Sequence, residues 1–252
     1  MKALLKSELM KLFTIRSTYI MIGISLALVI LLSFYFEGYK GNTGSPSSEL
    51  QPTALHEISI NTAGLGIMFA NIIAILFVAH EYRYNTIAYT LTANAQRLKV
   101  LLAKLATISW VTALFGIAVV ATALASYQAG VSLRGVDLPP QEFDVWLQFL
   151  KVAFYYASYG ILGIIVAVIV RSVVAAVAGI LIYSTVIEPL LGVIFSGVGR
   201  YLPMAAIDGT VAISLLENPI STATAFALTG AYLGTGLLVA GVLFSRRDAL
   251  TQ

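Results

Sequence analysis

The chain of 252 residues contains no cysteine, only two histidines and few charged residues. The absence of cysteine excludes disulfides, thiolate nucleophiles and cysteine-ligated metal sites. His56 and His80 lie too far apart in the sequence for one helix to present both to a metal. We therefore expect this chain to bind no metal and no cofactor.

The sequence also lacks the motifs by which most hydrolases and nucleotide-binding proteins are recognised. It has no G-x-x-x-x-G-K-[ST] phosphate-binding loop, so the chain itself does not hydrolyse ATP by that route. It has no H-E-x-x-H zinc motif and no plausible Ser/His/acid set. An intramembrane enzyme would need ionisable residues clustered at one depth, and the apolar stretches offer almost none. We predict no catalytic residues and no nucleic-acid partner.

Long apolar stretches dominate what remains. Hydrophobic residues make up 59% of the chain and charged residues 11%, against roughly 45–50% and ~25% in soluble domains. Each stretch is near the ~20 residues that a helix needs to cross a bilayer, and lipid requires such spans to be helical. The predicted fold is all-α: a single polytopic transmembrane domain, 1–252, in the lipid bilayer. Its six spans are expected at about residues 18–36, 58–80, 105–128, 147–170, 173–187 and 221–244.

The lysines and arginines divide unequally between the two sides of these spans. The side that holds the N-terminus carries most of them, namely Lys2, Lys6, Lys11, Arg16, Arg83, Arg97, Lys99, Lys104, Arg171, Arg246 and Arg247. The other side carries only Lys40, Arg134, Lys151 and Arg200. The positive-inside rule then places both termini in the cytoplasm of a multi-pass cell-membrane protein, which we take to be bacterial.

Residues 1–16 predict an amphipathic helix that lies in the membrane interface. Its apolar residues recur at helical spacing, and its lysines, which include Lys6 and Lys11, fill the opposite face. We expect these lysines to face anionic lipid. The alternative is the basic leader of a signal peptide. The apolar stretch that follows is too long for one and ends in no A-x-A site, which favours the interfacial helix.

The stretch 188–220 predicts a broken structure between the fifth and sixth spans. It is moderately apolar but interrupted by Pro189, Pro203 and Pro219 and by several glycines. We expect short helices at the outer surface or dipping into the membrane. Glu188, at its start, is interpreted as a helix-end carboxylate in the outer headgroup region. The alternative is a buried carboxylate, which would need a partner.

The segment after the second span is the best candidate for a functional site. Charged residues, among them Glu81 and Arg83, precede an apolar-periodic run and a second basic group. A short helix here would fit a groove on a cytoplasmic partner, and Glu81 and Arg83 would pair with that partner or with each other. The alternative is that Arg83, Arg97 and Lys99 only fix the topology, while Tyr82, Tyr84 and Tyr89 lie in the interfacial aromatic belt.

Two short motifs resemble ABC-2-type transporter permeases. The first is E-L-x-K-L near the N-terminus, here Glu8, Leu9, Lys11 and Leu12, followed by Arg16, Ser17 and Tyr19. The second is Glu81-Tyr82-Arg83-Tyr84-Asn85-Thr86-Ile87, with Thr90-Leu91 and Arg97 after it, which is similar to the family's E-Y-R-x-G-T-I…T-L…R pattern. Asn85 replaces the usual glycine, and asparagine tolerates a left-handed backbone better than most residues.

This resemblance implies more than the residues alone do. It implies a permease that pairs with a second permease copy or homologue and with two cytoplasmic ATPase subunits, and that moves a substrate outward. The segment between spans two and three would be the coupling helix, and Glu81, Arg83, Thr86 and Arg97 the residues that couple it to the ATPase. A membrane immunity or sensory protein of similar topology, which transports nothing, is the alternative. The sequence does not identify the substrate.

Overall fold

The computed structural model describes residues 2–40, 53–84, 86–93, 96–135, 144–195, 197–212 and 220–246. Within these ranges every regular element is a helix, as predicted. In order they are α1 (Lys2–Thr14), α2 (Arg16–Ile30), η1 (Leu31–Tyr39), α3 (Ala54–Arg83), α4 (Thr86–Ala93), α5 (Arg97–Leu133), α6 (Val145–Val170), α7 (Val173–Ile182), η2 (Tyr183–Ile187), α8 (Glu188–Ile194), η3 (Gly199–Tyr201), α9 (Pro203–Asp208), η4 (Gly209–Val211) and α10 (Thr222–Arg246). Asn85, Pro219, Arg247 and residues 41–52 and 136–143 lie outside the described residues.

Six of these helical stretches are long and apolar enough to cross a membrane, which confirms the predicted number of spans. The first combines α2 with η1, a π-helical segment, and the fifth combines α7, η2 and α8. The six stretches are Arg16–Tyr39, Ala54–Arg83, Arg97–Leu133, Val145–Val170, Val173–Ile194 and Thr222–Arg246. Several extend beyond the predicted bounds because the helices continue past the apolar stretch at one or both ends.

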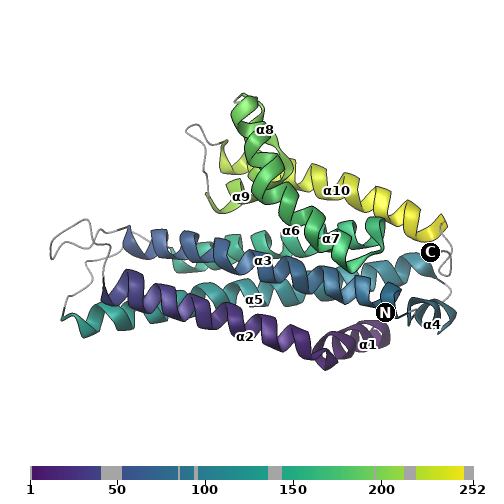
Figure 1. The fold of residues 1–252 in the computed structure, drawn as a ribbon, viewed down its shortest axis with the longest axis horizontal. Coiled ribbons are helices and arrows are strands. Elements are labelled where there is room, and N and C mark those ends of the chain that lie inside the picture. Colours follow the sequence, from purple (N-terminus) through teal and green to yellow (C-terminus); the bar gives the residue numbers. More distant parts are fainter. Residues whose placement is uncertain are drawn as a thin grey trace.

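The second, third and fourth spans form the centre of the bundle (Figure 1). They are largely buried, whereas the first, fifth and sixth spans bury about a fifth of their most apolar windows or less. These outer spans present large apolar side chains to the surroundings, among them Ile20, Ile24, Leu28, Val174, Val186, Val193, Leu238 and Val242. Such surfaces fit lipid or another membrane chain rather than water.

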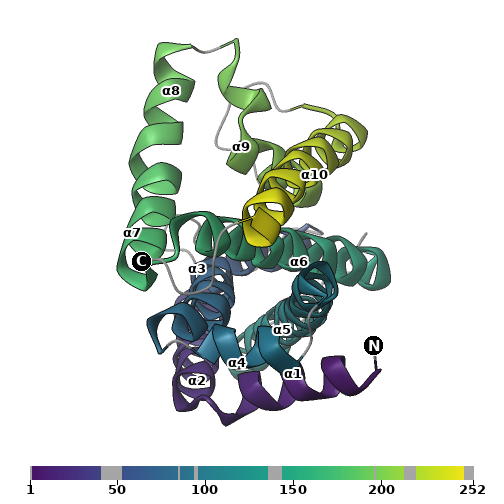
Figure 2. The ribbon, with the colours of Figure 1, turned by 90° about the vertical axis from the view of Figure 1, so that its right-hand side faces the viewer.

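The first and last described residues, Lys2 and Arg246, lie at one end of this bundle, which we call the N-terminal end. Figure 1 shows α1, α4 and the last turn of α10 gathered there. In the end-on view of Figure 2, α1 runs across the bundle instead of along it, which suits a helix in the plane of the interface. The other ends of α2–η1, α3, α5 and α6 lie at the far end. An even number of spans requires this placement of the two termini.

The close packing of the central helices depends on a tyrosine that lies between two glycines. The Tyr156 ring contacts Gly116 on α5, and its hydroxyl reaches Gly66 on α3, where a Cβ atom would collide with it. The same hydroxyl donates a hydrogen bond to the carbonyl oxygen of Ala63 at 2.9 Å. Small residues let the backbones approach closely, and the buried hydroxyl is satisfied without water.

The fifth span is longer than predicted, because Pro189 does not end it. The helix continues through η2 and α8 to Ile194, seven residues past the predicted boundary at residue 187. Pro189 lies in the first turn of α8, directly after the wider π-helical turn of η2. Proline is tolerated at such a position because its missing N–H is not needed there. The short helices predicted for the rest of this stretch are present as η3, α9 and η4.

Two carboxylates, one buried and one half-buried, hold the short helix α9 at its two ends. Glu188 accepts hydrogen bonds from the backbone N–H groups of Met204, at 3.1 Å, and Ala205, at 2.6 Å. We expected Glu188 to be a helix-end carboxylate in the outer headgroup region; it is 6% exposed and caps the positive end of α9, so the alternative of a buried carboxylate with partners is the one that the structure shows. At the other end, Asp208 accepts hydrogen bonds from the hydroxyls of Tyr155 (3.0 Å) and Tyr159 (2.8 Å) on α6.

Asp208 gives the protein a testable dependence on pH. Burial raises the pKa of Asp208 from 3.8 to about 6, against the lowering effect of the two tyrosine hydroxyls. The folded state then binds a proton more tightly than the unfolded state. The free energy of unfolding should fall as pH rises from about 4 to about 6, by on the order of 3 kcal/mol at most. Asp208→Asn should reduce this fall, as measured by thermal unfolding in detergent across the window.

The matched control for this experiment is Glu57→Gln, which removes an exposed carboxylate near the start of α3. It should leave the pH dependence as in the wild type. Equal slopes for wild type and Asp208→Asn would contradict the assignment to Asp208.

Candidate functional site

The short helix α4 lies at the N-terminal end of the bundle, between the second and third spans (Figure 1). Ile87, 1% exposed, packs into the protein, whereas Tyr89 is 76% exposed. The Thr86 hydroxyl contacts the carbonyl oxygen of Glu81, in the last turn of α3, at 3.5 Å. The helix is therefore held by the bundle at Ile87 and open to the surroundings at Tyr89.

A cluster of four charged side chains lies beside α4, and we call it the charge cluster. It consists of Glu8 and Lys11 from α1, Glu81 from α3 and Lys104 from α5. The Lys104 Nζ atom is 2.7 Å from both Glu8 Oε2 and Glu81 Oε1. The Lys11 Nζ atom is 2.7 Å from Glu8 Oε1 and 3.0 Å from Glu81 Oε1. Each lysine thus bridges both carboxylates.

The charge cluster is balanced and almost entirely closed to solvent. Glu8 and Lys104 are fully buried and Glu81 is 7% exposed, whereas the Lys11 side chain is 36% exposed. Lys104 also lies over the Phe77 ring, 4.8 Å from its centroid. Burying a charge is costly unless it is paired, so two acids and two bases suit this position. Burial alone would lower the pKa of Lys11, but Glu8 and Glu81 outweigh it and raise that pKa.

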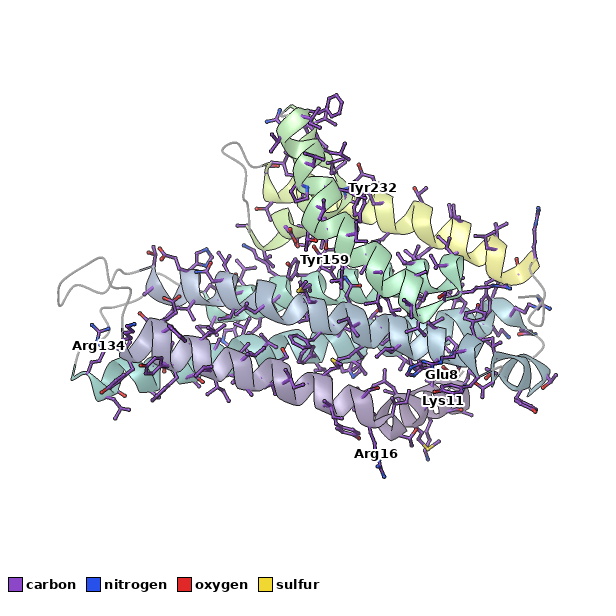
Figure 3. The ribbon with its side chains drawn as sticks, viewed as in Figure 1. Glu8, Lys11, Arg16, Arg134, Tyr159 and Tyr232 are labelled. Atoms are coloured by element: carbon purple, nitrogen blue, oxygen red, sulfur yellow. The ribbon has the colours of Figure 1, made fainter. Side chains whose placement is uncertain are left out.

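Lys11 connects this cluster to α4. Besides its two carboxylates, its ammonium group donates to the Thr90 hydroxyl on α4 at 3.1 Å. An ammonium group has three N–H donors, and these contacts use all three. Figure 3 places Glu8 and Lys11 where α1 meets the bundle, whereas Arg16 points away from it. The expectation that Lys11 faces anionic lipid is therefore wrong; Lys6 is exposed, and for that residue contact with anionic lipid stays a prediction.

The structure divides the four residues named as coupling residues into two pairs. Glu81 and Arg97 face the protein: Glu81 belongs to the charge cluster, and Arg97 donates a hydrogen bond to the carbonyl oxygen of Ser245, in the last turn of α10, at 3.1 Å. Arg83 and Thr86 are exposed. The Arg83 guanidinium lies 5.6 Å from the centroid of the Tyr84 ring. Glu81 pairs with two lysines rather than with Arg83.

The roles of Glu8, Lys104 and Thr90 in this site were not predicted from the sequence. A weak signal was present, because Glu8 is an acid within a basic, leucine-rich helix and Lys104 lies inside the apolar run of α5. A charge in such a position calls for a partner. Nothing in the sequence indicates that the partners come from helices far apart in the chain.

The fold and this site define a class of protein: a polytopic helical membrane protein whose N-terminal surface helix packs beside a short helix that follows the second span. A family model described as "ABC-2 family transporter protein" matches residues 4–187. The chain belongs to this family and is a membrane component of an ABC-2 family transporter, as its motifs indicated. The match includes α1, α4 and the charge cluster, and it ends before α8. No curated protein matches the chain.

Proposed function

We propose that this chain is the permease subunit of an ATP-binding cassette transporter whose ATP is hydrolysed by separate cytoplasmic subunits. Membership of the ABC-2 family supports this proposal. The absence of a phosphate-binding loop from the sequence is compatible with the proposal, because such a permease leaves ATP hydrolysis to another chain. The observation that carries the proposal is α4, a short helix that the bundle holds on one face and leaves open on the other.

The open face of α4 and the turn before it are proposed to dock on the ATPase. Tyr89 and Tyr84 are 76% and 63% exposed, and Arg83 and Thr86 are exposed beside them. Exposed tyrosines next to an arginine are typical of the anchors of protein interfaces. The positive charge of Arg83 favours a groove lined by carboxylates. Glu81 and Arg97 would contribute from inside, by holding α4 and the start of α5 in place.

The proposed transport cycle needs two permease chains around a shared path. The mostly exposed first, fifth and sixth spans provide apolar surface for a second copy or a homologue as well as for lipid. The basic residues at the N-terminal end of the bundle support a cytoplasmic location for that end. Movement of substrate from that end to the far end would then be export. Closure of the ATPase subunits around ATP would move α4. This motion would favour either the inward-open or the outward-open state of the permease. The shift can be no larger than the difference in the affinity of the ATPase for these two states.

Co-purification tests this proposal. The protein is extracted from the membranes of its own host in mild detergent, and a soluble ABC ATPase should be recovered with it. Arg83→Glu should abolish this recovery, because it reverses the charge of the proposed docking surface while leaving the buried charge cluster intact. ATPase recovery per permease is measured by quantitative mass spectrometry.

The matched control is Lys99→Glu, which reverses an exposed charge at the start of α5, outside the proposed docking surface. It should retain the ATPase. Recovery of the permease alone from membranes that contain such an ATPase would overturn the proposal and favour an immunity or sensory protein that transports nothing. Equal loss in both variants would show a non-specific charge effect.

A further inference from the structure

We propose that Lys11 is a positioning residue that makes α1 and α4 move as one unit. This inference rests on the proposed function in one respect: the docking of α4 on the ATPase is what would make α4 move. The contact itself lies within this chain, between α1 and α4. It assigns α1 to the moving part of the permease, in addition to any contact of this helix with the membrane surface.

The geometry of Lys11 supports this role. Its ammonium group contacts an oxygen on each of three elements: Glu8 on α1, Glu81 in the last turn of α3 and Thr90 on α4. Thr86 contacts the Glu81 carbonyl oxygen at the first residue of α4, but at the long distance of 3.5 Å. Thr90 lies one turn further along the helix. Lys11 therefore adds a polar contact one turn past Thr86 and the buried Ile87, and so limits how far α4 can pivot about its first turn.

The buried part of the cluster, which comes from α1, α3 and α5, holds the Lys11 ammonium group in place for its contact with α4. Displacing α4 from α1 would leave one N–H of the Lys11 ammonium group without its acceptor, Thr90, and an unpaired charged donor is costly. One acceptor is unused: among the described residues, Glu81 Oε2 accepts no hydrogen bond. Lys11 or Lys104 can move from Glu81 Oε1 to Glu81 Oε2 and stay paired with the same carboxylate. The cluster can thus rearrange as α4 moves while every charge stays paired.

Spin-label distances on the permease alone test this inference. The natural chain contains no cysteine, so Met10→Cys on α1 and Thr92→Cys on α4, both at exposed positions, give one defined label pair. With Lys11 and Thr90 intact, the distance distribution measured by pulsed electron paramagnetic resonance should be narrow. Thr90→Val should broaden it, although this substitution keeps all four charges. Lys11→Met should broaden it as well.

The double variant Lys11→Met, Thr90→Val distinguishes a direct contact between these two residues from two independent effects on α4. If Lys11 acts on α4 through Thr90, then Thr90→Val should add no further broadening to Lys11→Met, since residues in one network are not additive. Thr90→Ser, which restores the hydroxyl, should return the narrow distribution. Lys6→Met, on the exposed side of α1, is the matched control and should leave it unchanged. A distribution that Thr90→Val leaves narrow would overturn the inference.

A second measurement tests whether the Lys11–Thr90 contact affects ATP hydrolysis by the partner subunits. In nanodiscs that contain the permease and its ATPase, Thr90→Val should retain the ATPase but lose most of the stimulation of ATP hydrolysis by the permease. Wild-type stimulation in Thr90→Val would overturn the link. If no ATPase binds wild-type permease, the proposed function fails, and the label distances still decide whether Lys11 joins the two helices.

Discussion

Replacing Lys104 by methionine is expected to cost the protein most of its folded population. The side chain is fully buried, and its ammonium group is 2.7 Å from a carboxylate oxygen of both Glu8 and Glu81. Methionine fills a similar volume but removes the charge, so two buried carboxylates would face each other with only Lys11 between them. Removing one member of a buried ionic group costs about 3–5 kcal/mol. The yield of monodisperse protein and its melting temperature in detergent measure the effect.

A compensating variant tests whether charge imbalance is the cause. Lys104→Met combined with Glu8→Gln leaves one acid, Glu81, and one base, Lys11, at 3.0 Å. This double variant should recover part of the lost stability. Lys99→Met, which removes an exposed lysine from the same helix, is the matched control and should behave like the wild type. A Lys104→Met protein as stable as Lys99→Met would contradict the structural account of the cluster.

The number of spans was predictable because it depends on a local property. A bilayer requires about 20 apolar residues and a helical backbone for each span, and both requirements can be read from a window of sequence. The fifth span shows the limit of this reasoning. Pro189 predicted an end to the helix, but the preceding π-helical turn accommodates it, and such a turn leaves no recognisable mark in the sequence.

The candidate site was predictable in its location but not in its connections. The charges after the second span marked the position of α4, and the motifs indicated the family. The partners of Glu81 were not predictable, because Glu8, Lys11 and Lys104 come from elements far away in the chain. The same holds for Glu188, whose partners are backbone N–H groups. The hydropathy of a segment indicates that a charge within it needs a partner. Only the packing of the helices shows which residue that partner is.

Packing at the far end of the bundle gives the second large expected effect, from Gly130→Ala. On α5, a Cβ atom at this position would lie 2.5 Å from the carbonyl oxygen of Phe34 and 2.9 Å from the Cα atom of Gly38, both on η1. These are backbone atoms, so no side-chain rotation relieves the contact. Overpacking of this kind typically costs about 1–3 kcal/mol, and here it should push the first span away from α5.

Gly23→Ala on α2 is the matched control, because a Cβ atom there meets nothing within 4 Å. Alanine favours a helix over glycine by about 1 kcal/mol, so this variant should melt at the wild-type temperature or above it. Melting temperatures of both variants in detergent measure the contrast. The Arg134 Nη1 atom donates to the Gly38 carbonyl oxygen at 3.2 Å, and separation of η1 from α5 would break this bond too. If Gly130→Ala melted no lower than Gly23→Ala, the first span could not be in backbone contact with α5.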